Sequence, residues 1–160
     1  MLPSALLLTL HWLSVRAWLG RAHTDPRAGR SLWLLAPFAG IALATYATFL
    51  GSDGEIYRWL RSYSAQLYFA SVYVSQLAFL HRYRQIAGCR RGIANGMLAI
   101  ALAMLALGVS YTAVANAFDD AALKDRMENL LEWHIGLLMT GWYLLQTAVW
   151  RQSRFRLTTA

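Results

Sequence analysis

Clusters of arginine separate four long stretches of this chain that contain no Asp, Glu, Lys or Arg. These stretches are Ser31–Ser52, Ser62–His81, Gly92–Phe118 and Trp133–Trp150. Each is close to the roughly 20 apolar residues that an α-helix needs to cross the hydrocarbon core of a bilayer. The chain is 58% hydrophobic and only 14% charged, which is too apolar for a soluble domain of 160 residues. We therefore expect an all-α protein, a polytopic transmembrane helical bundle with four spans and a short fifth.

The loops between these stretches alternate in charge. The basic loops contain Arg21, Arg27 and Arg30; Arg82, Arg84, Arg90 and Arg91; and Arg151, Arg154 and Arg156. The loop after the first stretch is balanced, and the loop after the third contains Asp119, Asp120, Asp125 and Glu128. Because short loops rich in Lys and Arg stay on the cytoplasmic side, the pattern predicts a cytoplasmic C-terminus. In a bacterial host the expected location is the plasma (inner) membrane.

The first twenty residues are the ambiguous part of the chain. Leu2–Val15 is apolar, but Arg16 interrupts this run before it reaches the length of a span. The segment lacks the basic start and small-residue cleavage site of a signal peptide. It is expected to form a short fifth span with Arg16 reaching the inner face, and an interfacial helix is the alternative. The predicted spans, within one membrane domain over residues 1–160, are approximately 2–20, 31–50, 62–81, 93–118 and 129–150.

The segment 62–81 is the most polar of the predicted spans. Its embedded polar residues are Ser64, Gln66, Ser71, Ser75 and Gln76. Polar side chains in hydrocarbon seek partners on other helices, so this segment is expected to occupy the interior of the bundle. The segment 93–118 is rich in Ala and Gly, which permits close helix approach.

Glu132 is the acidic residue within a predicted span, about one turn from its outer boundary. Because an ionisable group is costly at such depth, it is a candidate for function. The alternative is a helix-end position, where the free amides favour an anion. The topology brings other polar groups to this level, and we predict an outer ligand-binding cluster of Glu132, His134, Gln66, Tyr111, Tyr46 and Asn116. An interfacial belt of aromatic residues is the simpler alternative for these positions.

The basic loop between the third and fourth stretches is expected to contact lipid headgroups. We call Arg82, Arg84, Arg90 and Arg91 the inner basic loop. Its charges lie beside the bilayer, where they attract anionic lipids. The net charge of +7 therefore does not indicate a nucleic-acid partner, since the basic residues lie in short loops at helix ends.

The sequence contains no recognisable catalytic, metal-binding or cofactor-binding motif. Cys89 is the single cysteine, so an internal disulfide is impossible, and no Cys/His set has zinc spacing. GxSxG, HExxH and Gly-rich phosphate-loop motifs are absent. We predict no catalytic residue, no metal and no cofactor. Two alternatives stay open: a membrane enzyme or haem-binding electron-transfer subunit built on Glu132 and His134, and a small transporter with Glu132 as its protonatable group.

Four features follow one another along the chain in an order that has a counterpart in a known family. They are Arg30-Ser31-Leu32 leading into Phe38–Leu50, a polar-aromatic span with Ser71-Val72-Tyr73 and Gln76, a small-residue span, and Glu132-Trp133 opening the last span. This order resembles the damage-regulated autophagy modulator (DRAM) family of multispanning membrane proteins. Family members usually have six spans, so the resemblance implies that this chain corresponds to the last five, with Leu2–Gly20 as a shortened second span.

The resemblance also implies a kind of activity. Members of the family act without obvious catalytic residues in autophagy modulation, GPI-anchor lipid remodelling and plasma-membrane lipid organisation. It implies that Glu132 orders the last helix. We therefore predict a non-catalytic integral membrane protein that organises or binds lipid or a partner helix within the bilayer. The expected partners are membrane lipids and a partner membrane protein or a second copy of the chain.

Overall fold

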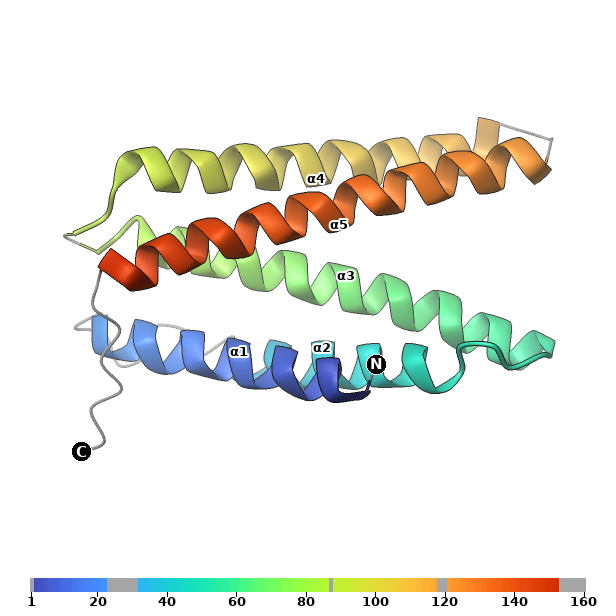
Figure 1. Ribbon diagram of the computed structural model, residues 1–160, viewed down its shortest axis with the longest axis horizontal. Coiled ribbons are helices and arrows are strands. Elements are labelled where there is room, and N and C mark those ends of the chain that lie inside the picture. Colours follow the sequence, from blue (N-terminus) through green and yellow to red (C-terminus); the bar gives the residue numbers. More distant parts are fainter. Residues whose placement is uncertain (1, 23–31, 87, 118–120, 153–160) are drawn as a thin grey trace. The chain divides into compact units, whose positions relative to one another are not determined.

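The computed structural model describes residues 2–22, 32–86, 88–117 and 121–152, and these residues are helical apart from short turns (Figure 1). The helices are α1 (Leu2–Ala22), α2 (Leu32–Thr48), α3 (Glu55–Tyr83), α4 (Arg91–Ala117) and α5 (Ala121–Gln152). They coincide with the five predicted segments, which confirms the all-α fold and the helical state of the N-terminal segment.

Two of the helices begin well before the predicted spans. Helix α3 begins at Glu55 rather than near residue 62, and α5 begins at Ala121 rather than near residue 129. The roughly two added turns of α5 contain Ala, Leu, Lys and Met, which are strong helix formers. Charge does not end a helix, so the helix extends past the uncharged stretch from which the span was predicted.

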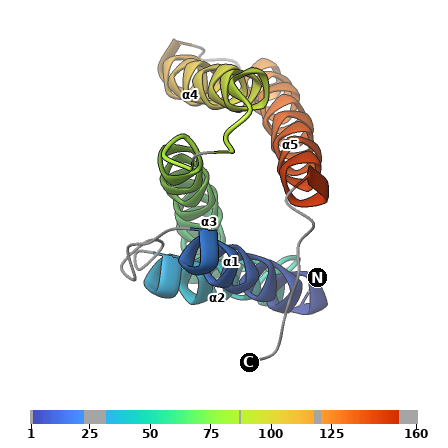
Figure 2. The same ribbon diagram turned by 90° about the vertical axis from the view of Figure 1, so that its left-hand side faces the viewer.

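The chain divides into two compact units, and each is described by itself. The first unit covers Met1–Cys89 and contains α1, α2 and α3; the second covers Arg90–Ala160 and contains α4 and α5. In the first unit α2 packs against both α1 and α3. Figure 2 shows α1 and α2 side by side in the view turned by 90°.

A glycine allows α1 and α2 to approach closely. A Cβ atom on Gly40 would overlap Thr9 Oγ1 and would lie 3.2 Å from the carbonyl oxygen of Ala5. Only a residue without a side chain fits there, and small residues are the usual means by which helices in lipid come together. At the other end of this pair, the Arg16 guanidinium lies over the Trp33 ring, 4.8 Å from its centroid.

Helix α3 follows α2 through a glycine turn and packs antiparallel to it. Gly51 and Gly54 have φ values of 86° and 127°, which side-chain-bearing residues rarely adopt. Across the turn, the Phe49 and Tyr57 rings stack with centroids 5.4 Å apart, which sets the register of the two helices.

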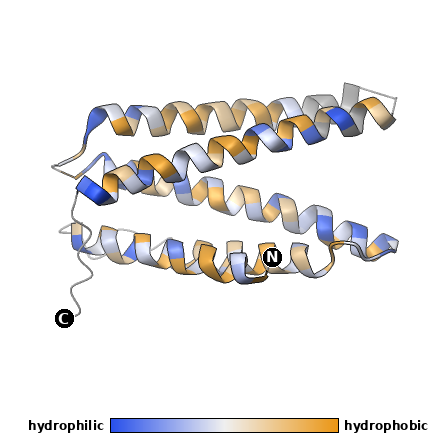
Figure 3. Ribbon diagram, viewed as in Figure 1, coloured by the Kyte–Doolittle hydropathy of each residue, from blue (hydrophilic) through white to orange (hydrophobic). Residues whose placement is uncertain are grey.

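The second unit is a helical hairpin in which glycines on each helix receive side chains from the other. Gly96 on α4 faces Leu145 Cδ1, 3.3 Å from a hypothetical Cβ, and Gly141 on α5 faces Ile100 Cδ1 at 3.5 Å. Both pairs have residue numbers that add to 241, so they define one antiparallel register. Helix α4 is apolar through its middle (Figure 3).

One helix among the described residues is both long and apolar enough to cross a membrane by length and composition alone. It is Arg91–Tyr111 in α4, with a mean hydropathy of 2.0. Helix α2 is also apolar but has only 17 described residues. Polar residues in α3 and charged residues at the start of α5 lower the mean hydropathy of those two helices.

Candidate functional site

The described helices bury polar side chains and expose large apolar ones. The fully or nearly buried polar residues are Ser64, Ser71, Ser75, Gln76 and Gln146. By contrast Leu34 is 73% exposed, Trp133 76% and Leu144 68%. Large apolar side chains such as Trp12, Phe79 and Trp142 also fill the core, so the features that are unusual for a soluble protein are the buried glutamines and the exposed large apolar side chains.

The polar residues of α3 largely behave as predicted. Ser64, Ser71, Ser75 and Gln76 are buried, as the predicted interior position of this segment requires. The hydroxyls of Ser71 and Ser75 donate to the carbonyl oxygens one turn earlier, at 2.6 Å and 2.8 Å. Neither amide atom of Gln76 has a hydrogen-bond partner. Gln66, by contrast, is exposed.

Glu132 and His134 both lie on exposed positions of α5. Glu132 comes eleven residues after the first residue of the helix, Ala121, so the alternative reading of a helix-end carboxylate is wrong. His134 Nδ1 lies 2.7 Å from the carbonyl oxygen of Leu130. A carbonyl can only accept, so Nδ1 carries the proton and Nε2 is left as the nitrogen that can accept a hydrogen bond.

The register of the hairpin places Tyr111 near these two residues in height. Numbers that add to 241 set Tyr111 level with Leu130, two residues from Glu132. At a rise of about 1.5 Å per residue, Tyr111 and Glu132 differ in height by about 3 Å. Asn116 belongs to α4, but its side chain lies outside the part of the chain that the structure describes. The second unit therefore brings Tyr111 and Glu132 to nearly the same level, with His134 about 6 Å from Tyr111 in height.

The remaining two members of the predicted cluster belong to the first unit and do not share a level. Tyr46 is half-buried on α2 and Gln66 is exposed on α3. The stacking of Phe49 on Tyr57 sets Tyr46 level with about residue 60 of α3. Gln66 is six residues further along, which is about 9 Å at the helical rise. The two side chains do not form one polar site.

The inner basic loop is held by main-chain hydrogen bonds at the end of α3. The amide of Gln85 donates to Arg82 O at 3.0 Å, and that of Cys89 donates to Ile86 O at 3.0 Å. Arg84, Arg90 and Arg91 are exposed, and Arg82 is half-buried with its guanidinium 3.5 Å from Gln85 Oε1. The loop therefore presents exposed guanidinium groups, as its predicted contact with lipid headgroups requires.

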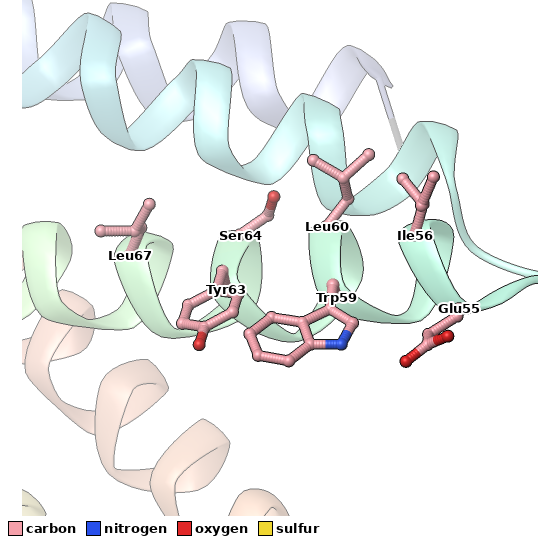
Figure 4. A pocket seen from close by; sticks show the side chains of 7 residues that line it. All are labelled: Glu55, Ile56, Trp59, Leu60, Tyr63, Ser64 and Leu67. Atoms are coloured by element: carbon pink, nitrogen blue, oxygen red, sulfur yellow. The ribbon is translucent and has the colours of Figure 1, made fainter.

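A groove that was not predicted from the sequence runs along the first half of α3. Its volume is about 500 Å³. Figure 4 shows its lining as two rows of side chains on one helix. One row is formed by Glu55, Trp59 and Tyr63, and the other by Ile56, Leu60, Ser64 and Leu67. Each row repeats at helical spacing, a pattern visible in the sequence, so a search for apolar and aromatic residues at i and i+4 would have found it.

Comparison with protein-family models, with curated proteins and with solved structures finds no match. Among the described residues there is no group of three or more His, Cys, Asp or Glu side chains placed to hold a metal ion.

Proposed function

We propose that this chain is a polytopic integral membrane protein that binds lipid or a partner helix within the bilayer and carries out no chemistry of its own. The observation that supports this proposal is the exposure of many large apolar side chains while a few polar ones are buried. Gln76 and Ser75 are fully buried while Leu34 and Trp133 are largely exposed. Water would penalise both features, because exposed leucine gains nothing there and a buried unpaired amide is costly.

A bilayer removes the penalty for the exposed apolar residues. Lipid tails are as apolar as leucine, so helices in a membrane associate through close packing and interhelical polar contacts instead. The close approach at Gly40 and the glycine contacts of the hairpin are packing of this kind. The inner basic loop sets the orientation, with the C-terminus in the cytoplasm.

The lone cysteine offers a direct test of this topology. Cys89 is half-buried in the inner basic loop, and Ser52 lies in the turn between α2 and α3. In intact spheroplasts, a membrane-impermeant maleimide should leave Cys89 unlabelled until the membrane is permeabilised. The matched variant, Ser52→Cys in a Cys89→Ser background, should label without permeabilisation. Recovery of the protein in the soluble fraction, or equal labelling of both positions from outside, would refute the proposed insertion.

The proposal that the protein carries out no chemistry rests on the directions of Glu132 and His134 on α5. Glu132 and His134 differ by two positions and so point in nearly opposite directions on α5. A role in lipid or partner organisation is also what the resemblance to the DRAM family implies. If the purified protein turned over a lipid substrate and Glu132→Gln abolished this turnover, the non-catalytic role would be wrong.

A further inference from the structure

The groove on α3 combines one charge, two aromatic rings and an aliphatic wall. Glu55 is its only charged lining residue. The Trp59 and Tyr63 rings stack with centroids 5.1 Å apart at an interplanar angle of 25°. The two side chains are 57% and 51% exposed, so each ring keeps a surface that a ligand can contact. Trp59 lies between Glu55 and Tyr63 in this row (Figure 4), so a group beside the indole also lies beside the carboxylate.

The second row gives the groove an apolar wall along its length. Ile56 is 73% exposed and Leu67 is 47% exposed. These side chains extend from the charged end of the groove along α3 for eleven residues, which is about 16 Å at the helical rise. An extended hydrocarbon chain fits such a wall.

The charged end of the groove favours a cation. An ammonium group is attracted both by a carboxylate and by the face of an indole or phenol ring, and aromatic sites are a common means of recognising alkylated ammonium groups. The N-terminus of α3 opposes this attraction with a partial charge of about half a unit, which is smaller than the full charge of Glu55. Arg58, which is exposed and three residues after Glu55, gives a phosphate a cation to contact on the same turn.

We propose that this groove binds a phospholipid whose headgroup ends in an ammonium group. The ammonium lies between Glu55 and Trp59, the phosphate lies near Arg58, and an acyl chain follows the row from Ile56 to Leu67. This inference rests on the proposed function, since it requires α3 to be in a bilayer. It narrows that function to a lipid class defined by its headgroup.

The test is a lipid competition on the full-length protein. The protein is reconstituted in nanodiscs of phosphatidylglycerol and given equal amounts of brominated phosphatidylethanolamine, phosphatidylcholine or phosphatidylglycerol, with quenching of tryptophan fluorescence as the measurement. Both ammonium lipids should quench at a concentration roughly three to ten times lower than phosphatidylglycerol does. Equal quenching by all three lipids, or stronger quenching by phosphatidylglycerol, overturns the proposal.

Matched variants identify the groove as the origin of the preference. Glu55→Gln should abolish most of the preference for ammonium lipids. Asp53→Asn removes the same charge from the adjoining turn, and Trp133→Leu removes an exposed indole from α5, so both should keep the preference. A preference that survives Glu55→Gln, or that is lost in Asp53→Asn, overturns the proposal.

Maleimide labelling of the same preparations separates the two proposals. Correct labelling at position 52 without a headgroup preference refutes the lipid site and leaves the membrane topology intact. Failure of the labelling pattern refutes both.

Discussion

The contact at Gly40 provides the sharpest test of how the first unit is packed. In a Gly40→Ala variant the new methyl group would overlap Thr9 Oγ1 and would lie 3.4 Å from Thr9 Cβ. The Thr9 hydroxyl cannot rotate away without losing the hydrogen bond that it donates to Ala5 O at 3.0 Å. That carbonyl oxygen is itself 3.2 Å from the new Cβ and belongs to the helix backbone. The methyl group therefore fits only if the Thr9 hydroxyl turns away and the Ala5 carbonyl shifts by a few tenths of an ångström.

The expected cost follows from three contributions. A methyl group forced into a packed contact costs about 1–3 kcal/mol. Loss of the Thr9–Ala5 hydrogen bond costs about 1 kcal/mol. Replacing glycine by alanine inside a helix returns about 0.5–1 kcal/mol. The last two nearly cancel, so Gly40→Ala should lower the free energy of unfolding by about 1–3 kcal/mol.

The assay is unfolding in mixed micelles titrated with sodium dodecyl sulfate and followed by tryptophan fluorescence. Gly20→Ala is the matched control, because a Cβ on Gly20 meets nothing within 4 Å. It should be neutral or stabilising by about 0.5–1 kcal/mol. Thr9→Ala combined with Gly40→Ala should recover part of the loss, since the overlapping hydroxyl is gone. If Gly40→Ala behaves like Gly20→Ala, or if Thr9→Ala gives no recovery, α1 and α2 do not pack as described.

Three further predictions concern the turn, the interior of α3 and the inner basic loop. Gly54→Ala should lower the free energy of unfolding by about 1–3 kcal/mol, because φ is 127° there. Gly88→Ala is the control and should not lower it, because the backbone is unstrained and a Cβ there meets open space. Equal effects of the two substitutions would contradict this prediction. Gln76→Leu should raise the free energy of unfolding by about 1 kcal/mol or more, since neither amide atom of Gln76 has a hydrogen-bond partner. A destabilised variant would mean that the Gln76 amide binds a water molecule. Replacing the four arginines of the inner basic loop with glutamine should make the lone cysteine accessible to maleimide from outside in part of the population, and unchanged protection would show that this loop does not set the orientation.

The positions of the helices could be predicted from the sequence because uncharged length and helix propensity act locally. The first residues of α3 and α5 could not be predicted, because charged residues mark the membrane boundary and do not mark the helix boundary. Residues 121–128 are charged but favour the helix, so α5 extends beyond the uncharged stretch. This is why Glu132 lies well inside a helix and not at its end.

The predicted polar cluster shows where reasoning from depth alone fails. Depth along a span does not specify which way a side chain points. Gln66 is two residues after the buried Ser64, about 200° further around α3, and is therefore exposed. The register between helices is also invisible in a single sequence. The contacts of Gly96 and Gly141 supply it for the hairpin, where Tyr111 and Glu132 do share a level.

The two faces of α3 connect the packing of the first unit to the groove. The inward face carries the polar residues Ser75 and Gln76 beside the apolar Val72 and Phe79, and the outward face carries Ile56 and Trp59. Under the proposed membrane insertion, lipid surrounds the outward face, and a groove on that face is filled by lipid before any other ligand arrives. Selection among lipids then depends on the single charged end of the groove, which is the reason that the headgroup and not the acyl chain is expected to decide what binds.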